Sequence, residues 1–377
     1  MKRQIYSHVW KKLLKKNKLY CRGVVAPTWS CTHRQVTNYA AAQNSSAVLN
    51  LQKRHLEICC EPLQDSLKLS YVWLRDHCRC SECYNDTTNQ RNLDLLQIPD
   101  NIKPTSSNIQ DNKLIVTWED GHTSEYCLNW LRNNSYNNYV TSQTQELLLW
   151  DKHTDIENKV AREDINNYMS SDKALYNVVK SIVDYGVAIV TNVPAAVDAT
   201  EKVVQKISHV QHTMFGGMWQ FSDHYSHYDT AYTCTALGAH NDNTYFTEAA
   251  GLQVFHCLHH IGTGGETLLV DGFRAAHDLK QTHPASYKRL ASLPIESEYI
   301  EPGRHYFSVE PVLKLHPITN QLQQIRFNLY DRAPMRTLPY EETVQLYQDL
   351  RLLAGKVKDP QGEWWFKLHP GTVLINQ

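Results

Sequence analysis

The sequence lacks two features that would point to a nucleic-acid or a membrane partner. Its 38 lysines and arginines are balanced by 39 aspartates and glutamates, for a formal net charge of −1. Bulk charge therefore does not suggest a nucleic-acid partner. No apolar run approaches the roughly 18 residues of a membrane-spanning helix, so no membrane partner is predicted. With 377 residues, the chain has the length of about two domains.

Acidic residues are absent from the start of the chain, where the first one is Glu57. On a helical wheel, Ile5, Val9 and Leu13 share one arc, while several lysines lie opposite. A basic amphipathic helix followed by a polar stretch is typical of a mitochondrial presequence. We therefore predict that residues 1–54 are a presequence or a disordered segment. A disordered basic tail and a nuclear signal are the alternatives.

The ten cysteines lack the spacing of a disulfide framework. Cys78, Cys80 and Cys83 lie within one short loop, and three cysteines cannot all pair with one another. Such clustering suggests a reducing compartment and metal binding. His122 could supply a fourth ligand from a hairpin packed against the loop. Three cysteines and one histidine form a closed tetrahedral site, so we expect structural zinc, with a disulfide plus a spare thiol as the alternative.

The apolar pattern predicts a small β-rich domain at residues 55–145 and a larger domain at residues 165–377. In the small domain, Leu67–Leu74 and Lys113–Trp118 have the composition of strands. The charged and Asn-rich stretch between the two domains is predicted to connect them.

The larger domain is predicted to open with a helix and a strand. Apolar residues recur at helical spacing from Ala174 to Val183, Gly186 ends the helix, and Val187–Val190 has strand character. A last helix begins near Pro339. Its predicted buried residues are Val344, Tyr347, Leu350 and Leu353.

The sequence His240-Asn241-Asp242 is a candidate metal motif. A His-x-Asp triplet can hold a divalent metal through one imidazole and one carboxylate. In the 2-His-1-carboxylate arrangement, the metal is a non-haem iron(II) with open positions for oxygen and a co-substrate. Alone the triplet is a weak signal, because most such triplets lie in solvated turns. Its setting strengthens it, since Leu252 and Val254 alternate as in a strand, and Thr267 follows where the next strand would return to the metal.

The stretches HNDNTYF, GLQVFHCL, GTGGETLLVDGF and FNLYDRAP resemble the family of γ-butyrobetaine and trimethyllysine hydroxylases, and more closely its trimethyllysine branch. The resemblance runs from about Cys78 to the C-terminus. It implies a mainly β fold with flanking helices. A double-stranded β-helix (jelly-roll) catalytic domain, TauD-like, would follow a small β-rich, zinc-binding N-terminal domain that carries the CxCxxC and the later His.

This resemblance implies an activity and its cofactors. The family hydroxylates a small molecule with iron(II) and 2-oxoglutarate, and ascorbate and structural zinc are further expected cofactors. The expected reaction is hydroxylation of N6,N6,N6-trimethyllysine at C3, the first step of carnitine biosynthesis, in the mitochondrial matrix. The alternatives are γ-butyrobetaine hydroxylation and a non-catalytic form. A homodimer is left open.

The resemblance also assigns site residues. His240 and Asp242 would bind iron, and Thr267 would assist 2-oxoglutarate binding. An aromatic box would hold the trimethylammonium group by cation–π attraction, although such dense aromatics are more often core packing. Asp229 would pair with the α-ammonium group. The implied substrate-binding residues are Phe215, Trp219, Asp229, Tyr232 and Asn328.

In the family, a PGxVL-type strand is followed by a segment with a second metal-binding His and an Arg that grips 2-oxoglutarate. The sequence ends at Gln377, before a matching segment. The resemblance therefore predicts a catalytic domain that is incomplete at its C-terminus. A truncated isoform or incomplete sequence and an inactive natural product are both open.

Overall fold

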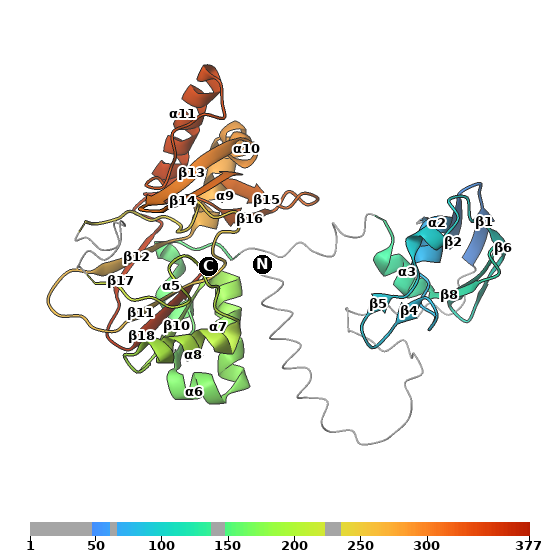
Figure 1. Cartoon of the computed structure of the whole chain (residues 1–377), viewed down its shortest axis with the longest axis horizontal. Coiled ribbons are helices and arrows are strands. Elements are labelled where there is room, and N and C mark those ends of the chain that lie inside the picture. Colours follow the sequence, from blue (N-terminus) through green and yellow to red (C-terminus); the bar gives the residue numbers. More distant parts are fainter. Residues whose placement is uncertain (1–46, 61–65, 137–147, 223–234) are drawn as a thin grey trace. The chain divides into compact units, whose positions relative to one another are not determined.

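The computed structural model describes residues 47–60, 66–136, 148–222 and 235–377. They belong to two compact units, one within Val25–Thr144 and one that contains Gln145–Gln377 (Figure 1). Most of the predicted presequence lies outside the described residues. Asp229 and Tyr232 also lie outside them.

The N-terminal unit is built from two three-stranded antiparallel sheets, ordered β1-β2-β3 and β6-β7-β8. In β7, alternate residues Leu114, Val116 and Trp118 are buried, as expected for a strand with one face on a core. β1 lies inside the predicted presequence, yet it pairs with β2. Folded structure therefore begins before residue 55. The elements are β1 (Ala47–Leu51), β2 (His55–Cys60), β3 (Ser66–Ser70), α2 (Tyr71–Asp76), β4 (Tyr84–Asn85), β5 (Gln90–Arg91), η1 (Leu95–Gln97), β6 (Pro104–Gln110), β7 (Lys113–Trp118), β8 (Thr123–Cys127) and α3 (Leu128–Asn134).

The predicted strand Leu67–Leu74 is only half correct. The strand ends at Ser70, and helix α2 begins at Tyr71. The Ser70 hydroxyl accepts a hydrogen bond from the backbone N–H of Trp73, which is the usual cap of a helix N-terminus. The cap, rather than the apolar composition, decides where the strand stops.

The second unit centres on a four-stranded sheet ordered β11-β18-β10-β9. β18, near the C-terminus of the sequence, lies between β11 and β10 and is antiparallel to both (Figure 1). β9 pairs in parallel with β10, so the unit extends N-terminal of residue 165, where the sequence predicted it to begin. The strands are β9 (Arg162–Asp164), β10 (Val187–Thr191), β11 (Gln253–Cys257) and β18 (Thr372–Asn376).

A two-stranded sheet, β12 (Glu266–Val270) with β17 (Glu363–Lys367), packs against the inner face of the four-stranded sheet. Ile189 and Leu374 of the larger sheet share one core cluster with Trp364, Leu269 and Phe366 of the smaller. The two sheets therefore enclose an apolar interior, as jelly-roll sheets do. The predicted fold class, mainly β with flanking helices, is confirmed.

Helices cover the outer face of the four-stranded sheet. Val190 and Val373 point away from the interior and pack with Val178 and Ile182. The predicted helix is confirmed, and Gly186, with φ 78°, ends it in a left-handed conformation that favours glycine. The covering helices are α6 (Ile165–Ser170), α7 (Asp172–Tyr185) and α8 (Val197–Ile207). η2 (Lys152–Thr154) and α5 (Ile156–Lys159) precede them, and Ile156 packs instead with Ile189 and Leu374 in the interior.

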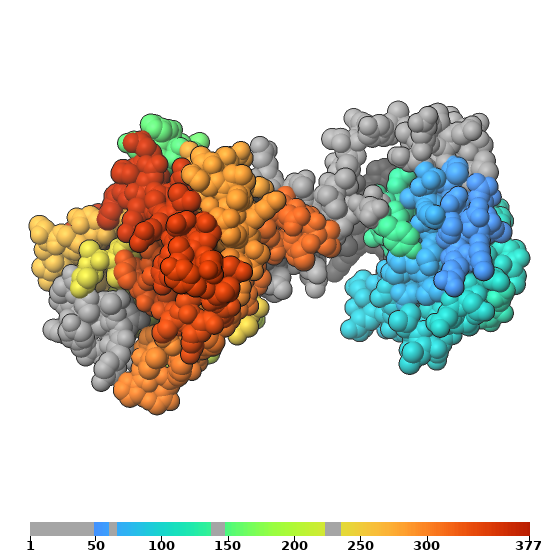
Figure 2. All heavy atoms as spheres, turned by 90° about the horizontal axis from the view of Figure 1, so that it is seen from above, coloured from blue at the N-terminus to red at the C-terminus, as the bar shows by residue number. Residues whose placement is uncertain are grey.

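An insertion between β12 and β17 has its own apolar core of helices and short antiparallel strands. Its helices lie against one another, and Figure 2 shows the orange and red-orange atoms of this region as one continuous surface. The elements are α9 (Gly272–Thr282), α10 (Pro284–Ser292), β13 (Pro294–Glu301), β14 (Arg304–Pro311), β15 (Leu313–Leu315), β16 (Leu322–Ile325) and α11 (Tyr340–Val357).

The buried stripe predicted for the last helix is partly wrong. Leu350 and Leu353 are buried in α11, but Val344 and Tyr347 are each 42% exposed. Leu346 is buried instead, because α11 packs on α9 and α10 along a face that is turned from the predicted one. No helix in the described ranges combines the length and apolarity needed to cross a membrane.

Candidate active site

His240 and Asp242 face each other across a short gap. The Nε2 atom of His240 lies 3.1 Å from Oδ1 of Asp242, and Nδ1 of His240 lies 2.7 Å from the carbonyl oxygen of Gly238. Two ligand atoms about 2.1 Å from one metal and at right angles would be about 3.0 Å apart. The pair therefore fits two adjacent positions on one ion, with Nε2 as the donor nitrogen. In the part of the chain that the structure describes, no third His, Cys, Asp or Glu completes a group with them.

The electrostatics of the pair favour positive charge between the two side chains. The hydrogen bond to Asp242 raises the pKa of His240 above its usual value, although burial opposes this. Burial would raise the pKa of Asp242, but the hydrogen bond and charge of His240 and the amide of Gln253 outweigh it and hold the pKa low. A cation placed between these atoms would meet an ionised carboxylate.

Asn241, between the two candidate ligands, fixes the motif to the segment after β16. Its backbone N–H donates to the Phe327 carbonyl at 2.8 Å, and its side-chain oxygen accepts from the Phe327 N–H at 3.2 Å. Asn241 thus points to Phe327, while His240 and Asp242 on either side of it face each other.

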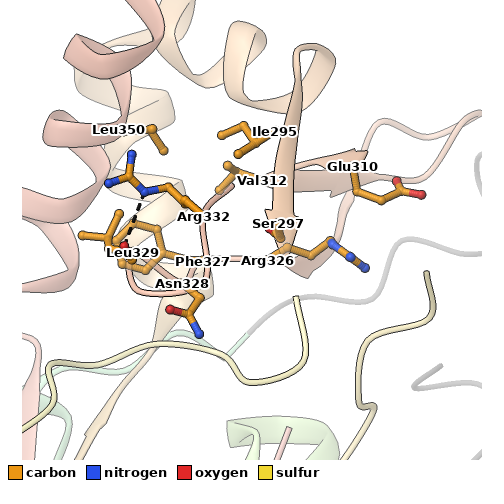
Figure 3. A pocket seen from close by; sticks show the side chains of 10 residues that line it. All are labelled: Ile295, Ser297, Glu310, Val312, Arg326, Phe327, Asn328, Leu329, Arg332 and Leu350. Atoms are coloured by element: carbon orange, nitrogen blue, oxygen red, sulfur yellow. Dashed lines mark hydrogen bonds between the residues drawn. The ribbon is translucent and has the colours of Figure 1, made fainter. Parts of the chain in front are cut away.

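The predicted substrate residue Asn328 is also bound to this loop. It is 7% exposed, and its amide N–H groups donate to the Asn241 carbonyl at 3.2 Å and to Asp331 at 2.7 Å. Its amide oxygen accepts from the backbone N–H groups of Tyr330 and Asp331. Figure 3 shows Asn328 at the lower edge of the small crevice lined by the insertion. In this arrangement all four hydrogen-bonding capacities of its amide are used within the protein.

Arg326 is a buried cation that supports the loop after the metal motif. Its guanidinium donates to the carbonyl oxygens of Thr244, Phe246 and Thr247 and to the Ser308 hydroxyl, the last at 3.1 Å. Burial lowers its pKa. Sequence reasoning missed this residue, because nothing in its local pattern distinguishes it from a surface arginine on a strand end.

Thr267 lies on β12, as the sequence predicted for the returning strand. It stands opposite Phe366 in the β12–β17 pair and two residues before Leu269. Both Phe366 and Leu269 pack in the interior between the two sheets. Side chains two residues apart on a strand share a face, so the Thr267 hydroxyl points to the same interior.

The structure brings together two of the predicted aromatic-box residues. Phe215 stacks on Trp219 with ring centroids 5.5 Å apart, and it meets Tyr299 edge-on at 5.8 Å. Tyr299 lies against Tyr245, whose ring is 5.1 Å away, five residues after His240 in sequence. The aromatic group therefore reaches Tyr245, in the segment that follows the metal motif. Tyr299, on the insertion strand β13, was not predicted, because its strand pattern is that of ordinary core packing.

In the N-terminal unit, Cys78, Cys80, Cys83 and His122 gather as predicted. Nε2 of His122 lies 3.3 Å from the sulfur of Cys78 and 3.6 Å from those of Cys80 and Cys83. Tetrahedral zinc with ordinary Zn–S and Zn–N distances would place sulfur and nitrogen about 3.6 Å apart. All four ligand atoms lie within 4.8 Å of one another. The residues present thus fit a closed tetrahedral ion.

The charge around this cluster also fits a metal. Burial raises the pKa of the Cys83 thiol to about 12 and lowers the pKa of His122. The Cys83 thiol therefore favours its protonated form unless a cation replaces the proton. Arg75, 7% exposed, donates to the Cys83 sulfur at 3.3 Å and to Asp120 at 2.9 Å. It supplies a positive charge next to a group that would carry net negative charge with zinc bound.

Comparisons with known proteins bear on both units. A family model described as "Taurine catabolism dioxygenase TauD, TfdA family" matches residues 152–377. A second model, "Gamma-butyrobetaine hydroxylase-like, N-terminal", matches residues 48–115 and 106–175. Each unit therefore has a match of its own.

Individual proteins are similar over most of the chain. A mitochondrial trimethyllysine dioxygenase of Bos taurus is 39% identical over 90% of this chain and 81% of its own length. The Homo sapiens protein of that name is 41% identical over 82% of this chain and 74% of its own length. The gamma-butyrobetaine dioxygenase of Homo sapiens is 26% identical over 80% and 79%. A solved taurine dioxygenase of Burkholderia xenovorans has a TM-score of 0.43 at 14% identity, over 58% of this chain and 77% of that one.

Proposed function

Because the chain belongs to the taurine catabolism dioxygenase TauD, TfdA family, we propose that it hydroxylates N6,N6,N6-trimethyllysine at C3 with iron(II) and 2-oxoglutarate. The observation that carries this is its similarity to trimethyllysine dioxygenases, which is greater than to the human gamma-butyrobetaine dioxygenase. The reaction is the first step of carnitine biosynthesis. The chain is therefore an oxidoreductase that acts on a small molecule.

His240 and Asp242 would hold the iron. Bound iron(II) would supply oxidation by O₂, coupled to the decarboxylation of 2-oxoglutarate to succinate, which is chemistry the protein itself cannot perform. Nε2 of His240 and Oδ1 of Asp242 are the donor atoms, and their 3.1 Å separation supports adjacent positions on one ion. Thr267, facing the interior between the sheets, would orient 2-oxoglutarate by its hydroxyl. Ascorbate would serve as a reductant.

Aromatic residues would select the substrate. The stacked pair Phe215 and Trp219 offers ring faces to a trimethylammonium group, which has no hydrogen to donate and is attracted by cation–π contact. Tyr232 would complete this box, and Asp229 would pair with the α-ammonium group that γ-butyrobetaine lacks. Asn328 would contact the substrate only by exchanging one of its internal hydrogen bonds.

The N-terminal unit would bind structural zinc through Cys78, Cys80, Cys83 and His122. A closed site with four protein ligands leaves no position for substrate, so this ion would stabilise the small unit rather than react. The agreement of the sulfur–nitrogen distances with tetrahedral geometry supports this role.

The chain would act in the mitochondrial matrix. The bovine and human relatives are named mitochondrial, and residues 1–46 are basic and free of acidic residues. A fusion of residues 1–46 to a fluorescent protein should enter mitochondria and be protected from added protease in isolated organelles. A fusion that stays outside would contradict this location.

Succinate release tests the activity. The 377-residue chain is assayed with iron(II), 2-oxoglutarate, ascorbate and either trimethyllysine or γ-butyrobetaine, beside a second protein that adds the C-terminal segment of the bovine relative. Trimethyllysine-dependent release by either protein, lost in its His240→Ala variant, is the expected result. Greater release with γ-butyrobetaine would favour the alternative substrate. No substrate-dependent release from either protein would contradict the proposal.

A further inference from the structure

Gln253, the first residue of β11, contacts the candidate iron-binding carboxylate. Its side-chain amide nitrogen donates a hydrogen bond to Oδ2 of Asp242. Its amide oxygen lies 3.4 Å from the amide nitrogen of Asn376, which is its direct partner across the β11–β18 pair. A chain of polar contacts thus runs from the sheet to the metal motif, from Asn376 through Gln253 to Asp242.

The pairing register of β11 and β18 determines which face of the sheet carries these polar contacts. Gln253 shares a face of β11 with Phe255, and Asn376 shares a face of β18 with Leu374. Phe255 and Leu374 both pack in the interior between the two sheets. The other face of β11 points to the covering helices, where His256 hydrogen-bonds Thr200 of α8 at 2.7 Å. The side chain of Gln253 therefore lies on the interior face of β11, and the metal motif borders this interior.

The two carboxylate oxygens of Asp242 have different partners. Oδ1 faces Nε2 of His240, while Oδ2 accepts the hydrogen bond from Gln253. The side chain of Asp242 is 42% exposed, so water competes for its oxygens and rotation about its last bond is otherwise little restrained. The hydrogen bond from Gln253 selects the rotamer in which a single oxygen, Oδ1, is presented beside His240.

We propose that Gln253 is a positioning residue that holds the Asp242 carboxylate for one-oxygen metal binding, an inference that rests on the proposed function. A glutamine suits this position because it donates to a carboxylate and accepts from Asn376 at once. A carboxylate would repel Asp242, and an aliphatic side chain would leave Oδ2 to water. Partners of this kind typically change metal affinity about 10–100-fold when they are lost.

Cobalt(II) binding to the full chain tests this inference. The Gln253→Leu variant keeps the side-chain size but removes both hydrogen bonds. We expect its cobalt affinity at the His240–Asp242 pair to fall about 10–100-fold, with a changed visible absorption spectrum of the bound ion. Asn376→Ala, which removes only the outer contact, should show a smaller loss in the same direction. Prior loading of the Cys78–His122 cluster with zinc keeps cobalt from that site.

Gln323→Leu is the matched control, because Gln323 is exposed on β16 and makes none of these contacts. It should bind cobalt as the unmodified chain does. If Gln253→Leu folds, as shown by an unchanged melting temperature, but binds cobalt with unchanged affinity and spectrum, the inference is wrong. If the unmodified chain binds no cobalt, or if His240→Ala leaves its cobalt binding unchanged, the proposed iron site is wrong instead. The two failures are therefore distinguishable.

Discussion

The two candidate metal sites differ in how many ligands they contain and in where the residues that support those ligands lie along the chain. In the N-terminal unit, three cysteines of one short loop and His122 of the β7–β8 turn bring four ligand atoms within 4.8 Å of one another. At the second site, His240 and Asp242 contribute two ligand atoms. Gly238 contacts His240 locally, but Gln253 and Phe327 reach the motif from other segments of the chain. A closed set of four protein ligands is suited to stabilising a fold. An open pair held from outside leaves coordination positions for reactants.

The supports of the two sites differ in the same way. Arg75, which contacts Cys83, lies in the helix just before the cysteine loop. At the open site, Asn241 is bound by Phe327, and the following loop is held by Arg326. These supporting residues lie in or beside the insertion. Geometry at the open site therefore depends on the packing of the whole unit.

The largest expected effect is on the closed site. Cys83→Ser should abolish zinc binding and unfold the N-terminal unit, because a structural zinc contributes on the order of 10 kcal/mol to such a fold. Zinc content and far-ultraviolet circular dichroism of the unit measure this. Cys59→Ser, outside the cluster, is the control and should retain zinc. A Cys83→Ser protein that stays folded without zinc would remove the distinction between the sites.

His240→Ala should show the opposite pattern at the open site. Succinate release should fall to the level of the no-substrate control, since one of the two candidate ligands is gone. Stability should fall by only about 2 kcal/mol, because the part-buried side chain contributes two hydrogen bonds. Release and melting temperature are compared with those of His259→Ala, a change of an exposed histidine. Retained activity would show that the iron is held elsewhere.

Arg326→Met tests whether the open site depends on distant support. The substitution leaves the carbonyl oxygens of Thr244, Phe246 and Thr247 without their donor, so we expect a loss of about 3 kcal/mol in the free energy of unfolding. Urea denaturation measures the loss, and cobalt affinity at His240 and Asp242 should fall with it. Arg304→Met, at an arginine whose side chain is 48% exposed, should change neither. Unchanged cobalt affinity in Arg326→Met would mean that the loop holds its own geometry.

The smallest expected effect comes from an ion pair that serves neither site. Asp349 is fully buried in α11 and lies 2.7 Å from Arg289, whose side chain is 35% exposed. Burial would raise the pKa of Asp349, but the hydrogen bonds from Arg289 and its neighbours outweigh it and hold the pKa below the ordinary value. Asp349→Asn should cost about 2 kcal/mol near neutral pH.

The sign of the pH dependence follows from this lowered pKa. The ion pair stabilises the folded state fully above the ordinary carboxyl pKa of about 3.9, and its contribution is lost as pH falls through the lower folded value. The cost of Asp349→Asn should therefore shrink in acid, as measured by urea denaturation at several pH values. Gln345→Ala, at a neighbour that donates to Asp349 at 3.2 Å, is the milder comparison. A cost that is independent of pH would contradict the charge-based account.

The cysteine ligands and the His240–Asp242 pair could be predicted because each group lies within a few residues of sequence. Cys78, Cys80 and Cys83 need no tertiary information to be recognised as a cluster, and His240 and Asp242 are two residues apart. Thr267 was expected on a returning strand, and it lies on β12. The supporting residues could not be found in this way. Gln253 and Arg326 stand out only when β11 and the segment after β16 are brought beside the metal motif.

The errors in the elements have the same origin. Apolar composition extended a strand through Leu74, where the single hydroxyl of Ser70 starts a helix. Apolar spacing in α11 predicted that Tyr347 is buried, although it is 42% exposed. Periodicity identifies the helix, but the position of α9 and α10 decides which of its faces is covered.

By itself, the sequence determined the residue types that can bind metal and the strand and helix periods around them, since both are properties of neighbours along the chain. The tertiary structure alone decided which carboxylate oxygen of Asp242 faces His240 and which face of each strand borders the interior. Those choices depend on contacts between residues such as Gln253 and Asn376, which lie far apart in sequence and meet only when β18 enters the sheet between β10 and β11. Burial and hydrogen-bond direction are set by such non-local packing, which no short window of sequence contains.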